Sequence, residues 1–239
     1  MNAVARSNAA GLRLWLARIL FAALAAFAAL QAWYLGWIVY WKWNDPAHTA
    51  FMQQAQQRLD LRRPAMRLQH QWVPYGRISP NLKRAVVAAE DARFLSHEGV
   101  DWEAVEKAYE QNLRRGHRAH GGSTISQQLA KNLFLSARRS YLRKAQELLI
   151  TWMVEALWSK KRILEVYLNV AEWGDGVFGA QAAARHYFDV DAGALSPEEA
   201  ATMAAMLPAP RLFDRHRDAP FLLQRTDSIL HELPEARIP

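Results

Sequence analysis

The stretch Glu90-Asp91-Ala92-Arg93-Phe94-Leu95-Ser96-His97-Glu98-Gly99 decides how the chain is read, because a clear helix signal leads into it. Residues 79–89 predict a helix: Ser79 can cap it, Pro80 suits its first turn, and apolar residues recur at helical spacing. Glu90 then lies at the C-terminal end, where the backbone dipole disfavours a carboxylate. An apolar scaffold there would raise the pKa of Glu90, as a general base requires. The alternative is a surface glutamate paired with Arg93 or Arg84.

The composition is that of a globular protein with a basic surface. Of the 239 residues, 51% are hydrophobic and 22% are charged, which excludes a disordered chain. The absence of cysteine excludes disulfides and thiolate metal sites. The net charge of +7 indicates an anionic partner, which could be nucleic acid, phospholipid headgroups or a phosphorylated substrate.

Residues 19–41 predict a transmembrane helix, because they carry no charge and are long enough to span a bilayer. Arg6, Arg13 and Arg18 precede the span, so the positive-inside rule places residues 1–18 in the cytoplasm. Aromatic residues crowd the far end, as in an interfacial belt. The alternative is a cleaved signal peptide, but the apolar run continues past the one sequence that resembles a cleavage site. We therefore expect an uncleaved anchor.

Residues 42–78 are predicted to form a juxtamembrane linker before a helical domain over residues 79–239. The linker contains a short helical pattern and a basic cluster, Arg62, Arg63 and Arg67. Each such residue would attract anionic headgroups by about 1 kcal/mol, although a solvated linker face explains the cluster equally well. Further on, His117 and His120 lie among arginines without an acidic ligand set, which favours a mobile basic loop over a metal site.

A second pattern is Gly121-Gly122-Ser123-Thr124-Ile125-Ser126-Gln127-Gln128-Leu129-Ala130-Lys131-Asn132. The glycines allow a tight turn, and Ser123 can cap the helix that follows. Gln128, Lys131 and Asn132 share one face of that helix. A glycine turn at a helix N-terminus favours anions, and Lys131 adds positive charge. The order Gly-Lys-Ser/Thr is missing, which argues against a nucleoside triphosphate.

A third pattern lies in the helix predicted after a basic run, Arg138, Arg139, Arg143 and Lys144. Glu147 follows Lys144 by three residues and Arg143 by four, so the three side chains can serve one cleft. The alternative is surface ion pairing worth roughly 0.3–0.5 kcal/mol. The buried stripe of this helix is predicted to consist of Leu142, Ala145, Leu149, Trp152 and Ala156.

The remaining chain is also predicted to be helical. Ser159 can cap a helix over residues 160–170, in which Tyr167 is expected in the core, and Glu165 and Asn169 are expected to bind buried backbone groups. Ser196 and Glu199 form a capping box for the next helix. Residues 219–233 predict a terminal helix.

Together these patterns resemble a known family. Glu90-Asp91-x-x-Phe94-x-x-His97-x-Gly99 resembles the first motif of the peptidoglycan glycosyltransferases, the polymerases of bacterial cell-wall glycan. The glycine-led stretch that ends at Asn132 matches their second motif throughout. Arg143-Lys144-x-x-Glu147 resembles the third motif, residues 161–169 the fourth and residues 201–210 the fifth. The resemblance covers about half of the chain, in the right order.

The resemblance implies a mainly α fold, a lysozyme-like helical glycosyltransferase domain preceded by one N-terminal transmembrane helix. It implies a peptidoglycan polymerase that transfers the growing lipid-pyrophosphate-linked glycan onto lipid II, forming β-1,4 bonds with inversion. The sequence contains no Ser-x-x-Lys and ends soon after the fifth motif, so no transpeptidase domain is expected. That favours the monofunctional biosynthetic branch of the family.

The chemistry and the resemblance assign roles to nine residues. Glu90 is the predicted base, and a lipid pyrophosphate leaving group needs cations rather than an acid. The predicted pyrophosphate clamp comprises Lys131, Arg139, Arg143 and Lys144, and the residues expected to line the sugar and phosphate sites are Ser123, Gln128 and Asn132. The resemblance marks Glu147 as essential, whether it orients the cations, helps to hold a divalent cation such as Mg²⁺ or Mn²⁺, or stabilises the donor. No metal ligand set is assigned.

The expected partners are lipid II, the nascent glycan and membrane lipids, with cell-wall synthesis or division proteins left open and no nucleic acid. The expected location is the bacterial inner membrane, with a single span and a periplasmic catalytic domain. One alternative is a muramidase or lytic transglycosylase that cleaves the same glycan, but such an enzyme needs an acid near the leaving oxygen. A second is a non-enzymatic basic scaffold whose nucleic-acid binding would fall steeply with salt.

Overall fold

The computed structural model describes residues 2–115, 122–138 and 140–239. The predictions for Arg139 and for the histidines of the basic loop lie outside these residues. The chain forms two compact units, one ending at Tyr40 and one beginning at Trp41. The first consists of helix α1 (Asn2–Trp41) up to the unit boundary, and the segment Arg13–Trp41 is long and apolar enough to cross a membrane. This is consistent with the predicted single-pass anchor.

The second unit is mainly helical, as the sequence predicts, and its elements follow one another with short connections. In chain order they are α2 (Ala50–Arg62), β1 (Gln69–His70), the 3₁₀ helix η1 (Tyr75–Arg77), α3 (Pro80–Glu90), α4 (Trp102–Arg115), α5 (Ile125–Phe134), α6 (Tyr141–Leu157), α7 (Lys160–Val170), β2 (Glu172–Gly174), β3 (Val177–Phe178), α8 (Ala180–Phe188), α9 (Pro197–Met206), α10 (Pro210–Phe213) and α11 (Pro220–Glu232). Residues 42–78, predicted as a linker, therefore contribute folded elements, and α2 contacts α5.

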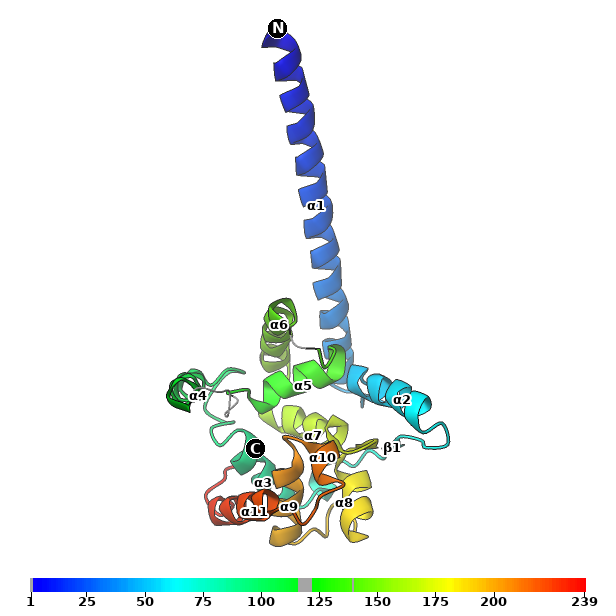
Figure 1. The fold of residues 1–239 in the computed structure, drawn as a ribbon, viewed down its shortest axis with the longest axis vertical. Helices are drawn as coiled ribbons and strands as arrows, with labels where there is room; N and C mark the ends of the chain where they lie inside the picture. Colours follow the sequence, from blue (N-terminus) through cyan, green and yellow to red (C-terminus); the bar gives the residue numbers. More distant parts are fainter. Residues whose placement is uncertain (1, 116–121, 139) are drawn as a thin grey trace. The chain divides into compact units, whose positions relative to one another are not determined.

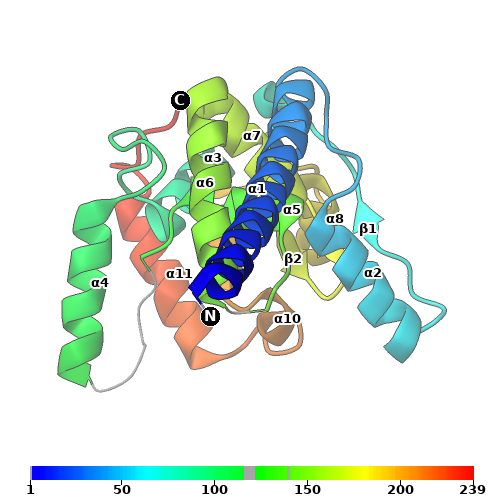
Figure 2. The same ribbon diagram turned by 90° about the horizontal axis from the view of Figure 1, so that it is seen from above.

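Two groups of helices form the core of this unit. Helix α5 packs against both α6 and α7, and helices α3, α9 and α11 pack on one another. Figure 1 shows the second group gathered at one end of the unit, and Figure 2 shows α4 at the margin of the unit. Helix α3 therefore belongs to the group that includes the terminal helix α11. Helix α5, which packs against α6 and α7, reaches the C-terminal end of α3 through the hydrogen bond from Gln128 to Glu90.

Three helices begin at the hydroxyl caps that the sequence predicts, where a side-chain oxygen accepts a backbone N–H in the first turn. Ser79, Ser159 and Ser196 cap α3, α7 and α9 in this way, and Ser140, which was not predicted as a cap, caps α6. The prediction that Ser123 caps α5 was wrong by one residue. Thr124 is the cap and forms a reciprocal capping box with Gln127, which leaves the Ser123 hydroxyl outside the helix.

The small three-stranded sheet of the second unit was not predicted from the sequence. β3 lies in the middle, parallel to β1 and antiparallel to β2, with Gln69 opposite Val177 and Glu172 opposite Phe178. Strands of two or three residues leave no alternating pattern long enough to detect. Gly179, at φ +81°, ends β3, and a Cβ there would lie 2.7 Å from a backbone oxygen of α7.

The predicted buried stripe of α6 was wrong. Leu142 is 85% exposed and Trp152 48% exposed, whereas the buried residues are Glu147, Ile150, Thr151 and Val154. The helix is rotated so that a partly polar face meets α5, and the Thr151 hydroxyl donates to the Glu147 carbonyl at 2.7 Å. Apolar spacing alone could not reveal that a carboxylate is held on the inner face.

The structural roles predicted for α7 are confirmed. The Asn169 side chain accepts the Val73 backbone N–H and donates to the Val73 carbonyl, both at 2.9 Å. Glu165 accepts the Tyr75 backbone N–H at 2.8 Å. These hydrogen bonds satisfy the backbone of an irregular segment and fix it against α7.

Candidate active site

Glu90 is the last residue of α3, and the local sequence explains why the helix delivers it to the interior. The Ser79 cap and Pro80 start the helix, and Leu82, Ala85 and Val86 are fully buried on its inner face. The side chain of Glu90 is consequently only 11% exposed.

Both carboxylate oxygens of Glu90 have a partner. The Gln128 amide nitrogen donates to Oε2 at 2.7 Å, and the Arg225 guanidinium lies 3.4 Å from Oε1. Burial raises the pKa of Glu90, whereas the Gln128 hydrogen bond and the charges of Arg225 and Lys131 oppose that rise. The predicted direction of the pKa shift is confirmed. The alternative pairing with Arg93 is wrong, because Arg93 binds acidic residues near α4.

A second acidic residue is held between two cations on α6. Glu147 is 3% exposed, the Lys144 ammonium lies 2.5 Å from its Oε1, and the Arg143 guanidinium pairs with its Oε2. Lys144 also lies 3.3 Å from the Gln127 side-chain oxygen and 3.4 Å from the Ser123 hydroxyl. The sequence prediction that the α6 residues meet is confirmed, and they also reach the start of α5.

Lys131 connects the two acidic positions electrostatically. It lies on α5, three residues after Gln128, so it shares a face with the side chain that binds Glu90. Burial lowers the pKa of Lys131, and the carboxylates of Glu147 and Glu90 raise it. Because the interaction between two charges weakens with distance, these shifts indicate that Lys131 lies within electrostatic reach of both carboxylates.

Two cavities meet beside these groups. One, of about 280 Å³, is lined by Glu90 and by residues 122–124 at the start of α5. The other, of about 360 Å³, is lined by Gln127 and Lys144 with apolar residues of α4 and α6. Ser123 lines both cavities, one with Glu90 and the other with Lys144. Asn132, by contrast, is buried within α5 and only 7% exposed.

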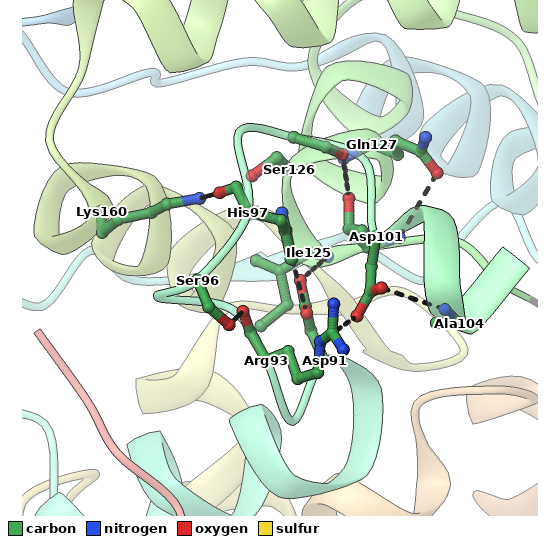
Figure 3. Close-up of polar contacts among 12 residues, drawn as sticks. Asp91, Arg93, Ser96, His97, Asp101, Ala104, Ile125, Ser126, Gln127 and Lys160 are labelled. Carbon is green, nitrogen blue, oxygen red and sulfur yellow. Dashed lines mark hydrogen bonds and ion pairs between the residues drawn. The ribbon is translucent and has the colours of Figure 1, made fainter.

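Asp91, His97 and Asp101 form a buried cluster next to Glu90 (Figure 3). One side-chain oxygen or ring nitrogen of each residue lies within 4.8 Å of those of the other two. Asp91 accepts from the His97 ring at 2.8 Å and from the Ile125 backbone N–H at 3.0 Å. Asp101 accepts the Ala104 backbone N–H and pairs with a guanidinium. All four carboxylate oxygens of Asp91 and Asp101 therefore have hydrogen-bond or ion-pair partners within the protein. The cluster ties the N-terminus of α5 to the end of α3 and so keeps the Gln128 side of α5 beside Glu90.

Comparison with known proteins identifies the family of this chain. The transglycosylase family model matches residues 57–234. The chain belongs to the transglycosylase family. It is 57% identical to a biosynthetic peptidoglycan transglycosylase of Laribacter hongkongensis over 94% of this chain and 99% of the relative. A biosynthetic peptidoglycan transglycosylase of Dechloromonas aromatica is 53% identical over 94% of this chain and 97% of the relative. The predicted family, helical fold and glycosyltransferase class are confirmed, and the lytic alternative is not favoured.

The sequence predictions missed the part that two groups play at the site. Arg225 lies on α11, outside every motif and 135 residues from the carboxylate it meets. Tyr167 was predicted as core, and it is only 1% exposed, yet its hydroxyl donates to the side-chain oxygen of Gln128 at 3.0 Å. No local pattern identifies Arg225, whereas the polar hydroxyl of a buried tyrosine is itself a signal that a partner must exist.

Proposed function

We propose that this chain elongates peptidoglycan by transferring the growing lipid-pyrophosphate-linked glycan onto lipid II, with β-1,4 bonds formed by inversion. The observation that carries the proposal is a buried carboxylate of raised pKa, Glu90, within electrostatic reach of Lys131 and its neighbouring cations. A base beside cations suits displacement of a diphosphate. Cleavage of glycan instead requires an acid at the leaving oxygen.

In the proposed reaction Glu90 removes the proton of the acceptor hydroxyl while that oxygen bonds to the anomeric carbon of the donor. The bond between this carbon and the phosphate oxygen breaks, and the negative charge passes to the lipid diphosphate. Lys131, Arg143 and Lys144 stabilise that charge, and Arg139 is a predicted further member of the clamp. Proton removal by Glu90 contributes about 10²–10⁴ to the rate.

The residues predicted to contact sugar divide into different roles in this proposal. Ser123 borders both cavities and is the best placed to contact the substrate. The Gln128 amide hydrogen-bonds to Glu90 through its nitrogen and to Tyr167 through its oxygen, so Gln128 positions the base and does not bind the sugar. Asn132 is buried and supports α5 from within.

For Glu147 we favour the role of ordering cations over that of holding Mg²⁺ or Mn²⁺. Each of its two oxygens already pairs with a positive side chain, Lys144 at one and Arg143 at the other. A divalent cation would have to displace at least one of them. Polymerisation that persists after removal of metal with EDTA is expected; strict loss and recovery on adding Mg²⁺ or Mn²⁺ would contradict this role.

The proposed location is the bacterial inner membrane, with the N-terminus in the cytoplasm and the second unit in the periplasm. The apolar segment Arg13–Trp41 and the arginines at its N-terminal side support this orientation. Membrane lipids, the nascent glycan and proteins of cell-wall synthesis or division would then be its neighbours. A periplasm-active reporter fused after Pro239 should be active, and an inactive reporter would contradict the orientation.

The decisive experiment is polymerisation of labelled lipid II by the purified full chain. Wild type should form polymer, whereas Glu90→Gln and Glu147→Gln should form little. Glu232→Gln, on the exposed surface of α11, is a matched control and should polymerise normally. A parallel incubation uses mature cell wall as substrate. Release of soluble fragments without any polymer from lipid II would refute the proposal.

A further inference from the structure

A chain of two hydrogen bonds leads from α7 to the carboxylate at the end of α3. The Tyr167 hydroxyl donates to the side-chain oxygen of Gln128 at 3.0 Å. The amide nitrogen of the same Gln128 donates to Oε2 of Glu90 at 2.7 Å. Tyr167 is 1% exposed and lies on a helix that packs directly against α5.

The chemistry of the three groups gives this series of hydrogen bonds a direction. A primary amide has one end that accepts and one end that donates, so its orientation decides what it offers to Glu90. An amide N–H favours an ionised carboxylate, whereas an amide oxygen favours a protonated one. Burial, with the charges of Glu90 and Asp91, raises the pKa of Tyr167 well above its ordinary value. Tyr167 therefore keeps its proton and remains a donor.

We propose that Tyr167 is a positioning residue: its hydroxyl fixes the Gln128 amide so that the N–H end faces Glu90 and holds that carboxylate ready to accept a proton. The inference rests on the proposed function of Glu90 as the base. Without the hydroxyl, the amide can rotate by half a turn and present its oxygen to Glu90. That orientation favours the protonated carboxyl, which cannot act as a base.

The charges around Glu90 cannot replace this contact. Asp91 follows it in the chain, Lys131 faces it from α5 and Arg225 from α11. These groups alter the electrostatic potential at the carboxylate, but they remain in place when the Tyr167 hydroxyl is removed. The contribution of the amide orientation is thus separable from the contributions of the charges.

The test compares Tyr167→Phe with Tyr187→Phe, using fluorescent lipid II and the full chain over a range of pH. Tyr187 is the matched control, since this half-buried tyrosine donates its hydroxyl to the Trp173 carbonyl and to Asp214, on another network. Tyr167→Phe should lower kcat about tenfold at pH values below the pKa of Glu90, with little change in KM, and kcat should recover as the pH rises. Tyr187→Phe should follow the wild-type profile. A Tyr167→Phe profile that matches wild type, or a loss equal at every pH, would overturn the inference.

A second variant distinguishes orientation from packing. Gln128→Met removes both ends of the amide and should move the pH profile in the same direction as Tyr167→Phe. The double variant should show no further movement, because the hydroxyl acts only through the amide. Additive effects in the double variant would contradict the inference.

A measurement without substrate separates this inference from the proposed function. The protonated carboxyl of Glu90 can be followed by infrared titration, with Glu90→Gln as the spectrum to subtract. Its midpoint should lie at higher pH in Tyr167→Phe than in wild type, and an unchanged midpoint would overturn the inference. If wild type formed no polymer from lipid II while the midpoint moved as expected, the proposed function alone would fail.

Discussion

Replacing Arg225 by methionine should make the candidate base harder to ionise. Methionine keeps a long apolar side chain but removes the guanidinium that lies 3.4 Å from Oε1 of Glu90. Burial already raises the pKa of Glu90, and the charge of Arg225 works against that rise. Loss of the cation therefore raises the pKa further. At any pH below this new pKa, a smaller fraction of the enzyme carries an ionised base.

The size of the effect follows from the distance and the exposure. Two unit charges 3.4 Å apart attract by about 1 kcal/mol in bulk water and about 5 kcal/mol at an effective dielectric constant of about 20. The Arg225 side chain is 29% exposed and that of Glu90 11%, so solvent screens the pair in part. We expect about 1–2 kcal/mol, which corresponds to roughly a 5- to 30-fold loss of kcat at pH values below the folded-state pKa of Glu90.

The assay is the initial rate of lipid II polymerisation as a function of pH. The rate of Arg225→Met should rise with pH later than that of wild type and approach it once Glu90 is fully ionised. Arg225→Lys should fall between the two, since it keeps the charge without the planar guanidinium. Arg185→Met removes an exposed arginine of α8 and should leave the profile unchanged. A rate for Arg225→Met that is lowered by the same factor at all pH values would refute the electrostatic reasoning.

Three further predictions concern stability. Because the pKa of Glu90 is raised in the folded state, ionisation of this carboxyl opposes folding. The contribution of the protonated Glu90 to the free energy of unfolding is fully present below the ordinary pKa of 4.5 and is lost as the pH rises through the folded-state pKa. Glu90→Gln should therefore abolish activity yet raise the unfolding free energy at neutral pH on the order of 1 kcal/mol, a gain that disappears in acid. Glu147→Gln leaves the two cations of α6 without a counter-charge, and urea unfolding should report a loss of about 1–3 kcal/mol; unchanged stability would mean that the pair is dispensable. Gly99 has φ +87°, and a Cβ there would lie 2.7 Å from Thr151 Cγ2, so Gly99→Ala should lower the unfolding free energy by about 1–3 kcal/mol. Gly76→Ala, with nothing within 4 Å of the added carbon, is its control and should have nearly unchanged stability in the same thermal melts.

The features that depend on neighbouring residues could be predicted from local patterns in the chain. Ser79 and Pro80 start α3 where predicted, and the spacing of Arg143, Lys144 and Glu147 brings their charges together within one turn of α6. The helical character of the second unit also follows from local signals, because caps and apolar spacing act within a few residues. The family motifs identified the region of the site for the same reason: each motif is a contiguous stretch.

Which helix faces meet depends on packing between segments that are distant in the chain, so local patterns could not predict it. The outer position of Trp152 and the inner position of Glu147 depend on how α6 rotates against α5, and both faces of α6 contain apolar residues. The contacts of Glu90 with Arg225 and, through Gln128, with Tyr167 join helices far apart in the chain. Such contacts arise when α3, α5, α7 and α11 bury their apolar faces together, and hydrophobic burial does not specify direction. The sequence therefore predicted the candidate base, whereas packing selected the groups that hold it.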